Sequence, residues 1–125
     1  MENEIILDSC VWLSFFSPED RNHKQAVEIL EEIEEHIVVP EIVFGEVVTI
    51  LRLRKKEDEV KQFYELCMGA SMFLPTGRLL WRTAVRYPHA PKKLSFVDAA
   101  LYILSKEYEV VTFDKVLKKA IEMRS

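Results

Sequence analysis

Four short apolar runs alternate along the chain with longer segments in which apolar residues recur at helical spacing. The runs predict buried strands at residues 5–7, 37–39, 71–74 and 110–112. The longer segments predict helices at residues 23–35, 41–53, 57–68, 76–87, 95–104 and 115–123. Strands that are apolar throughout and separated by helices are typical of a parallel sheet covered on both faces. The alternation therefore predicts an α/β fold of three layers, α/β/α, around a central parallel sheet of four strands.

Two of these helices are expected to differ in burial. Residues 23–35 place glutamates opposite a single apolar face, which predicts an amphipathic helix on the surface. Residues 41–53 are apolar on almost all sides, which predicts a buried helix.

Length and composition restrict the class of protein. The 125 residues have the length of one domain, residues 1–125, and are enough to bury a substantial core. Hydrophobic residues make up 49% of the chain and charged residues 30%, which excludes a disordered protein. No apolar stretch approaches the roughly 18 residues that a membrane span needs. The start, MENEIILDS, lacks the basic segment of a secretory signal, so we expect a cytoplasmic protein that does not contact a membrane.

Acidic and basic residues are segregated along the chain. Residues 1–50 carry a net charge of −10 and residues 51–125 a net charge of +6, within a total of −4. Residues 69–97 contain no acid, and five basic residues fall in this interval: Arg78, Arg82, Arg86, Lys92 and Lys93. A charge run is most often a solvated surface, but a segregated basic face can also bind a polyanion. These five residues are therefore candidates for nucleic-acid binding, with Arg52, Arg54, Lys55 and Lys56 as the alternative group.

Four acidic residues are expected at one edge of the sheet. Asp8 ends the first predicted strand, Asp114 follows the fourth, and Asp98 lies in the first turn of the helix between the third and fourth strands. Glu46 lies about five residues into the helix after the second strand, roughly 7.5 Å along it. Right-handed crossovers bring the carboxyl ends of parallel strands, and the starts of the helices that follow, to one edge. We therefore expect these carboxylates to face one crevice.

Each of the three aspartates also has a purely structural interpretation. Asp8 and Asp114 fit the N-cap position of the helices that follow them. Ser95 and Asp98 have the spacing of a capping box, in which the serine accepts a hydrogen bond from a helix amide. Capping and metal binding are both open for each aspartate on sequence grounds.

Glu46 has no such interpretation. It stands on an otherwise apolar helix, and Ile42 and Ile50 occupy the positions four residues away where a cationic partner would stand. A buried, unpaired glutamate is costly unless a cation compensates for its charge. Several converging carboxylates repel one another, and a hard divalent ion with oxygen ligands, Mg²⁺ or Mn²⁺ rather than zinc, relieves that repulsion. The four acids together therefore predict a divalent-cation site.

Four segments resemble a known family. In chain order they are IILDS, FGEVVTIL, LSFVDAALYIL and VVTFDKVL. Their order and spacing resemble those of the PIN-domain nucleases, particularly the short toxins of VapBC-type toxin–antitoxin pairs. The resemblance covers essentially the whole chain and implies a PIN-like fold in which a fifth strand is common. It implies that the catalytic metal site is formed by Asp8, Glu46, Asp98 and Asp114. It further implies that three hydroxyl residues support this site: Ser9, Ser95 and Thr112.

The resemblance also implies an activity and partners. The implied activity is that of an endoribonuclease, the metal-dependent hydrolysis of phosphodiester bonds in single-stranded RNA. The implied partners are a second copy in a homodimer and, for a toxin, an antitoxin that occupies the acidic site. The residues alone do not separate RNA from DNA, because no base-stacking platform or reader of the 2′-hydroxyl is identifiable.

Two positions depart from the family pattern. Cys10 stands where asparagine is common, which is expected to loosen a hydrogen bond near Asp8. The sequence continues only briefly after the last predicted helix, so we expect the fifth strand to be very short or missing.

Two other functions fit part of the pattern. A phosphatase with an aspartate nucleophile needs an acid two residues after the first, where this chain has Cys10. A receiver domain needs an aspartate after its middle strand, and none follows Leu74 directly. A catalytically inactive PIN-fold scaffold that binds RNA or protein is the other alternative, and the intact set of four acids argues against it.

Overall fold

A central parallel sheet runs through the computed structural model, which describes residues 3–70 and 72–124. Its strands are β1 (Glu4–Leu7), β2 (His36–Pro40), β3 (Met72–Leu74) and β4 (Glu109–Val111). Their order in space is β3-β2-β1-β4, and all the neighbouring pairs are parallel. The predicted four-stranded parallel sheet is confirmed, and within residues 3–70 and 72–124 no fifth strand is formed. Ser71, the predicted start of the third strand, and residues 1–2 and 125 of the predicted domain lie outside the described residues.

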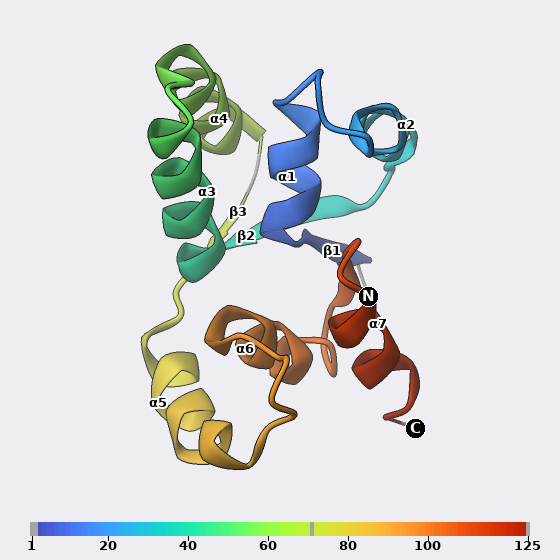
Figure 1. Cartoon of the computed structure of the whole chain (residues 1–125), viewed down its shortest axis with the longest axis vertical. Coiled ribbons are helices and arrows are strands. Elements are labelled where there is room, and N and C mark those ends of the chain that lie inside the picture. Colours follow the sequence, from blue (N-terminus) through green and yellow to red (C-terminus); the bar gives the residue numbers. More distant parts are fainter. Residues whose placement is uncertain (1–2, 71, 125) are drawn as a thin grey trace.

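Helices cover both faces of the sheet (Figure 1). One face carries α1 (Ser9–Phe15), α2 (His23–Glu32), α3 (Glu41–Leu53) and α4 (Glu57–Ala70). The other face carries α5 (Gly77–Arg86), α6 (Phe96–Leu104) and α7 (Lys115–Glu122), with the 3₁₀ turn η1 (Tyr87–His89) after α5. Helix α1 packs on α2 and α3, and α6 packs on α5 and α7. The predicted three-layer architecture is therefore confirmed.

The order of the strands reverses at β1. From β1 the chain moves to β2 and then to β3, each time over the face that α1–α4 cover. It then crosses the opposite face through α5 and α6 and adds β4 on the other side of β1. Open α/β sheets bind ligands outside the carboxyl ends of their strands, at the point where the order reverses. The adjacent ends of β1 and β4 are therefore the expected position of a site.

Apolar periodicity does not predict α1, which follows β1 directly, and only the capping interpretation of Asp8 indicates a helix there. Five of its seven residues are buried, including Val11, Trp12 and Leu13. A helix that is buried on most sides has no polar face, so its sequence lacks the periodic alternation that identifies a surface helix.

The sequence predicts a surface helix for α2 and a buried helix for α3, and only the first prediction is correct. Helix α2 buries only Ala26 among its ten residues, so the predicted surface helix is confirmed. Helix α3 buries a single stripe of Val43, Val47 and Leu51, while Gly45 is exposed. The prediction that this helix is buried on almost all sides is wrong, because α1, α4 and β2 cover only one side of it.

An aromatic cluster joins α4 to the elements beneath it. The ring of Phe63 is fully buried, and its centroid lies 5.0 Å from that of Trp12, 5.4 Å from that of Phe44 and 5.9 Å from that of Phe16. Edge-to-face and offset contacts at these separations add to the hydrophobic free energy of burial. Phe63 therefore holds α4 against α1 and α3.

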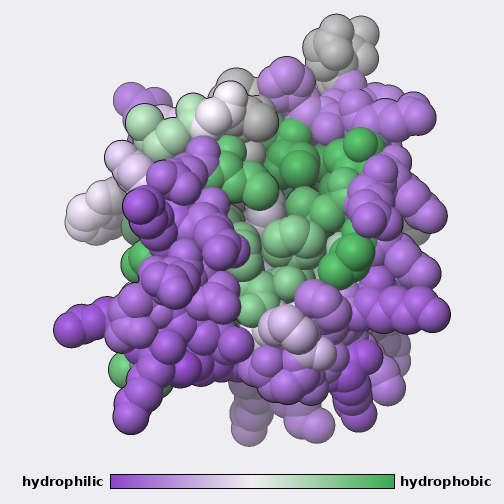
Figure 2. All heavy atoms as spheres, turned by 90° about the horizontal axis from the view of Figure 1, so that it is seen from above, coloured by the Kyte–Doolittle hydropathy of each residue, from purple (hydrophilic) through white to green (hydrophobic). Residues whose placement is uncertain are grey.

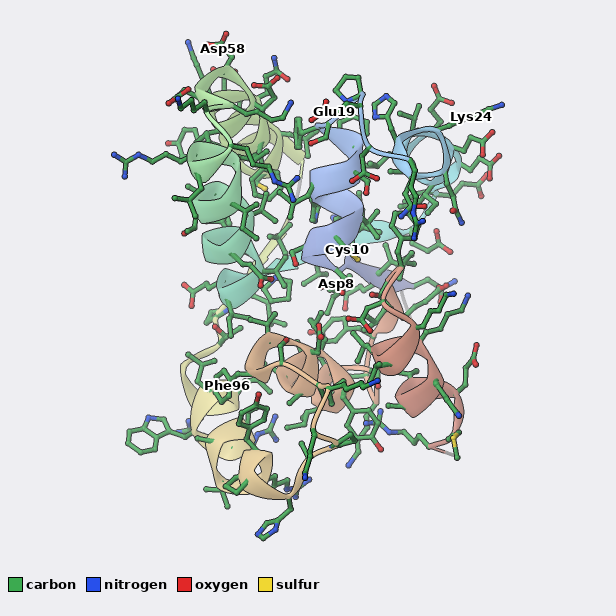
Figure 3. All side chains as sticks on the ribbon, viewed as in Figure 1. Asp8, Cys10, Glu19, Lys24, Asp58 and Phe96 are labelled. Carbon is green, nitrogen blue, oxygen red and sulfur yellow. The ribbon has the colours of Figure 1, made fainter. Side chains whose placement is uncertain are left out.

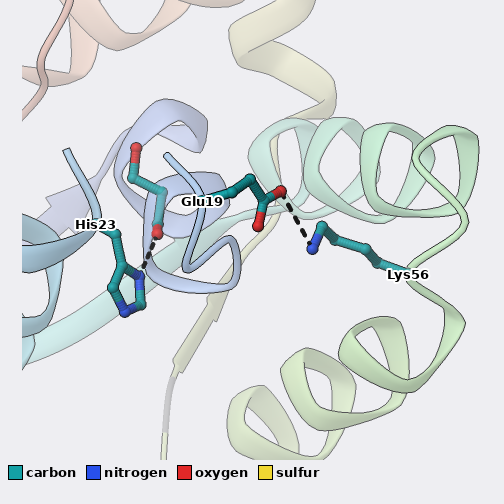
Figure 4. A network of polar contacts seen from close by, with 4 residues as sticks. Glu19, His23 and Lys56 are labelled. Carbon is teal, nitrogen blue, oxygen red and sulfur yellow. Dashed lines mark hydrogen bonds and ion pairs between the residues drawn. The ribbon is translucent and has the colours of Figure 1, made fainter. Parts of the chain in front are cut away.

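Two polar contacts hold the loop between α1 and α2 (Figure 4). The Glu19 carboxylate and the Lys56 ammonium are 3.4 Å apart, which connects this loop to the turn between α3 and α4. His23 Nδ1 lies 2.9 Å from the carbonyl oxygen of Ser14, which connects the start of α2 to α1. Because Glu19 is largely exposed, we expect solvent to screen the ion pair.

Apolar side chains also reach the surface. On the face that α1–α4 form, hydrophobic side chains occupy the centre and hydrophilic side chains surround them (Figure 2). Leu53, Tyr64 and Met68 on α3 and α4 are exposed. The helices in the described part of the chain are nevertheless all too short or too polar to span a membrane.

We expect Phe63→Ala to lower the free energy of unfolding by about 3–5 kcal/mol, because it removes a buried ring and leaves a cavity among three aromatic side chains. The adjacent substitution Tyr64→Ala is the control, since Tyr64 is 50% exposed, and it should change the value by less than about 0.5 kcal/mol. Urea titration of both variants measures the difference. Equal losses in the two variants would show that Phe63 does not anchor α4.

Candidate functional site

The carboxylate of Asp8 is buried at the end of β1, with 3% of the residue exposed. Asp8 is the N-cap of α1, and its Oδ1 accepts hydrogen bonds from the amide of Ser9 at 2.7 Å and from the Ser9 hydroxyl at 3.4 Å. Its Oδ2 accepts a hydrogen bond from the hydroxyl of Thr112 at 2.7 Å. In Figure 3 Asp8 and Cys10 lie at the base of α1, between the two layers of helices. The end of β1 thus carries a buried charge with several hydrogen-bond donors.

Thr112 connects two of the candidate acids. Its Oγ1 donates to Asp8 Oδ2 and accepts from the amide of Asp114 at 3.0 Å. The register of the strands, with Leu7 opposite Val111, brings residues 8 and 112 side by side. The supporting role that the sequence predicts for Thr112 is consistent with this geometry, as is that of Ser9.

Cys10 keeps a weak polar contact with Asp8. Its Sγ lies 3.5 Å from both Asp8 Oδ2 and Thr112 Oγ1, and it accepts a hydrogen bond from the amide of Phe113 at 3.3 Å. Burial raises the pKa of the Cys10 thiol to about 11, and the charge of Asp8 adds to this shift. The thiol is therefore neutral at pH 7 and can act as a weak donor to Asp8.

Asp98 and Asp114 stand at the starts of two other helices. Asp114 is the N-cap of α7, and its Oδ1 accepts from the amides of Val116 at 2.8 Å and Leu117 at 3.1 Å. Ser95 is the N-cap of α6 and accepts from the amide of Asp98 at 3.1 Å. The predicted capping roles of Asp8, Asp114 and Ser95 are confirmed. The positive ends of α1, α6 and α7 favour negative charge at these positions.

The three aspartates interact electrostatically. Burial raises the pKa of Asp98 to about 6, the negative charges of Asp8 and Asp114 raise it too, and hydrogen bonding with Ser95 opposes the rise. A carboxyl group that has a pKa near 6 exchanges its proton close to neutral pH. Asp98 is therefore close enough to Asp8 and Asp114 to be affected by their charges.

Glu46 differs from the three aspartates in its hydrogen bonding. It occupies the middle of α3, and its Oε1 is buried with no hydrogen-bond partner among the described residues. In residues 3–70 and 72–124, no three His, Cys, Asp or Glu side chains lie close enough together to hold a metal ion. The binding of one cation by these four acids therefore stays a prediction.

The predicted basic residues do not all lie near the aspartates. Arg78, Arg82, Arg86, Lys92 and Lys93 are all exposed. Arg82 and Arg86 line a cavity of about 130 Å³ with Leu104, in the last turn of α6. Asp98 lies in the first turn, roughly 9 Å away along the helix. Arg86 also lines a second cavity, of about 500 Å³, with Ala99, which directly follows Asp98. Phosphate binding by these arginines stays a prediction.

One polar contact of this site is not predicted from the sequence, that of the amide of Phe113 with Cys10 Sγ. Phe113 lies between Thr112 and Asp114, and this position is its only sequence signal, because a phenylalanine in an apolar context predicts core packing. For Cys10 the sequence predicts a weakened hydrogen bond near Asp8, and the long contact of 3.5 Å between Cys10 Sγ and Asp8 Oδ2 is consistent with that prediction.

Comparison with known proteins gives two findings. The model of the PIN domain family matches residues 5–122. The crystal structure of VapC20 from Mycobacterium tuberculosis, a toxin that cleaves the sarcin–ricin loop, is similar to this chain with a TM-score of 0.76. The two sequences are 21% identical, and the match covers 93% of this chain and 94% of that one. No curated protein matches the sequence.

We expect Thr112→Val to lower the free energy of unfolding by about 1–3 kcal/mol, because the substitution takes a hydrogen bond from the buried carboxylate of Asp8. Thr112→Ser is the control, since it keeps the hydroxyl and should cost about 0.8 kcal/mol for the lost methyl group. Chemical denaturation in a chelating buffer measures both values. A valine variant that is as stable as the serine variant would show that the hydroxyl contributes nothing.

The raised pKa of Asp98 predicts a pH dependence of stability in the absence of metal. Between the ordinary pKa of 3.8 and about 6, the folded protein holds a proton that the unfolded chain has lost. The contribution of protonated Asp98 to the free energy of unfolding is therefore fully present below pH 3.8 and is lost as the pH rises through about 6. Asp98→Asn should remove this part of the pH dependence. Melting temperatures in chelator, measured between about pH 4 and 7, test it, and identical profiles for wild type and variant would contradict it.

Proposed function

The chain belongs to the PIN-domain family, and on that premise we propose that it is an endoribonuclease that uses Mg²⁺ or Mn²⁺ to hydrolyse phosphodiester bonds in single-stranded RNA. The observation that carries the proposal is the electrostatic coupling of Asp8, Asp98 and Asp114 at the carboxyl edge of the sheet, where its strand order reverses. The similarity to VapC20 supports the further proposal that the protein is the toxin of a toxin–antitoxin pair.

The side chains of this edge fit a hard divalent cation. The donors are carboxylate oxygens, which Mg²⁺ and Mn²⁺ prefer. Glu46 Oε1 is buried with no hydrogen-bond partner among the described residues, and a cation would satisfy it. Asp8, Glu46, Asp98 and Asp114 are the residues that would hold the ion. When bound, a divalent cation lowers the pKa of a water molecule and stabilises negative charge that develops on a phosphoryl group.

The other residues of the site act on the carboxylates. The hydroxyl groups of Ser9 and Thr112 fix the orientation of Asp8 through hydrogen bonds to its two oxygens. Ser95 fixes the first turn of α6 and with it the position of Asp98. Asp98 has a pKa of about 6, so it holds a proton in acid and must lose it to become a ligand. We therefore expect activity to fall as the pH drops below about 6.

A catalytically inactive scaffold is the alternative function. One observation favours it, namely that the acidic side chains of the described residues do not approach closely enough to form a ready ligand set. Such a scaffold would bind RNA or protein without cutting it.

The partners belong to the proposal as well. The family implies a second copy of the chain and, for a toxin, an antitoxin. Apolar surface that a partner could cover is present on the α1–α4 face (Figure 2) and on α5, where Trp81 and Val85 are 79% and 75% exposed.

A cleavage assay tests the proposal. Labelled single-stranded RNA is incubated with the protein in Mg²⁺, in Mn²⁺ and in chelator, and we expect cleavage only when a metal is present. A matched DNA strand tests the choice of RNA. RNA that is bound but not cut under any of the metal conditions would favour the scaffold.

We expect Glu46→Gln to abolish the metal-dependent cleavage while leaving the fold intact, because the amide keeps the shape of the side chain but lacks the charge that holds a cation. The rise in melting temperature that Mn²⁺ causes should also shrink, which is a readout independent of activity. Glu65→Gln, at an exposed position on α4, is the matched control. If the Glu46 variant cuts RNA at the wild-type rate, Glu46 is a tolerated buried acid and not a ligand.

A further inference from the structure

A cavity of about 490 Å³ adjoins the aspartates on the outer side of β4. It lies between α2 and α7, which flank the sheet on its two faces (Figure 1). Thr112 lies in its wall, and Thr112 is the residue that donates to Asp8. We call this cavity the α2–α7 groove. The groove and the candidate site thus share Thr112, at the point where β4 ends.

Three cations and one acid line the α2–α7 groove, and all four side chains are exposed: Arg21, Lys115, Lys118 and Glu122. Lys115 directly follows Asp114, and Lys118 lies about one turn further along α7. Glu122 lies one more turn away, so the positive charge is concentrated at the end of the groove that is nearest to the aspartates. Phosphates that lie next to the candidate site would therefore be beside cations.

An aromatic side chain stands at the same end. Phe113 is half-buried, lines the groove, and is located between Thr112 and Asp114. Its amide is held by Cys10 Sγ, which fixes the backbone at this position. Proteins that bind single strands combine cations for the phosphates with aromatic rings on which bases stack. The groove offers both beside the candidate catalytic acids.

The groove also borders the outer edge of β4, which has no neighbouring strand within the described residues. An extended acidic peptide could therefore pair with this edge. The position of Phe113 favours a nucleic acid, because a stacked base uses an aromatic face and an acidic side chain does not.

We infer that the α2–α7 groove binds the single-stranded nucleic acid next to the bond that is cut, with Arg21, Lys115 and Lys118 on phosphates and Phe113 under a base. The inference rests on the proposed function and assigns its substrate track to residues other than the arginines of α5. Arg82 lines a cavity beside the last turn of α6, and Arg86 lines both that cavity and one beside Ala99, whereas Lys115 directly follows Asp114.

Binding of a short fluorescent single-stranded RNA, measured by anisotropy in chelator over a series of KCl concentrations, tests the inference without cleavage. We expect the double variant Lys115→Gln, Lys118→Gln to reduce the slope of log K against log[salt] by about 1.4, since each phosphate contact on a single strand contributes about 0.7. The matched control is Lys24→Gln, Lys119→Gln, which removes the same amount of charge from α2 and α7, the two helices that flank the groove, at positions that do not line it. Its slope should stay close to that of the wild type.

Phe113 is tested in the same assay. Phe113→Ala should weaken binding about tenfold or more through the loss of stacking, with the salt slope unchanged. Phe113→Tyr keeps the ring and should restore the affinity, which separates stacking from a general effect on the fold.

The outcomes distinguish the inference from the proposed function. A protein that cuts RNA while its lysine double variant keeps the wild-type slope overturns the inference alone. A slope that falls for Arg82→Gln with Arg86→Gln, but not for the lysine pair, also overturns it and assigns the track to α5. If the lysine double variant binds polyglutamate more weakly than the wild type but binds RNA equally well, the inference is overturned in favour of an acidic protein partner. If the double variant lowers the salt slope of RNA binding but the wild-type protein never cuts RNA, the inference is supported and the proposed nuclease activity is wrong.

Discussion

The buried carboxylate of Asp8 constrains much of the structure around the end of β1. A charged group that is 3% exposed needs hydrogen-bond donors, because its hydration is lost. The first turn of α1 supplies the amide and hydroxyl of Ser9, and β4 supplies the hydroxyl of Thr112. The second donor exists only because β4 pairs with β1 in a parallel register that sets Leu7 opposite Val111. The charge therefore depends on the sheet topology, and it also holds the two strand ends together.

Capping and metal binding are compatible roles for the three aspartates. Asp8 and Asp114 satisfy helix amides, and Asp98 lies in the first turn of a helix that Ser95 caps. The helix starts offset part of the repulsion among the carboxylates, which allows them to gather without a cation. The offset is incomplete, since Asp8 and Asp114 still raise the pKa of Asp98. The remaining repulsion is a reason for a divalent ion to bind, because it would remove an unfavourable interaction that folding leaves in place.

An acidic site that acts on RNA must attract a polyanion in spite of its own charge. Cations close to the site reduce this repulsion, and their effect falls off within about 10 Å at ordinary ionic strength. The two basic groups of this chain differ in that respect. Lys115 and Lys118 lie within the first turns of α7, which Asp114 caps, whereas Arg82 lies beside the last turn of α6 and only Arg86 also lines a cavity beside Ala99. Proximity in the fold, and not the density of charge along the sequence, decides which group can assist the chemistry.

The sequence by itself determined the strands and the parallel sheet, because apolar periodicity and the handedness of crossovers are local rules with few exceptions. The convergence of Asp8, Glu46, Asp98 and Asp114 on one metal site stays a prediction. The sequence did not determine α1, whose burial on most sides removes the amphipathic signal, or the exposed side of α3, which depends on which neighbours cover it. Nor did it identify the contacts that Cys10 makes with Thr112 and Phe113, or the cations of the α2–α7 groove. Those contacts join residues about a hundred positions apart, as between Cys10 and Thr112. Only the tertiary structure decides them, because each depends on the register in which β4 meets β1.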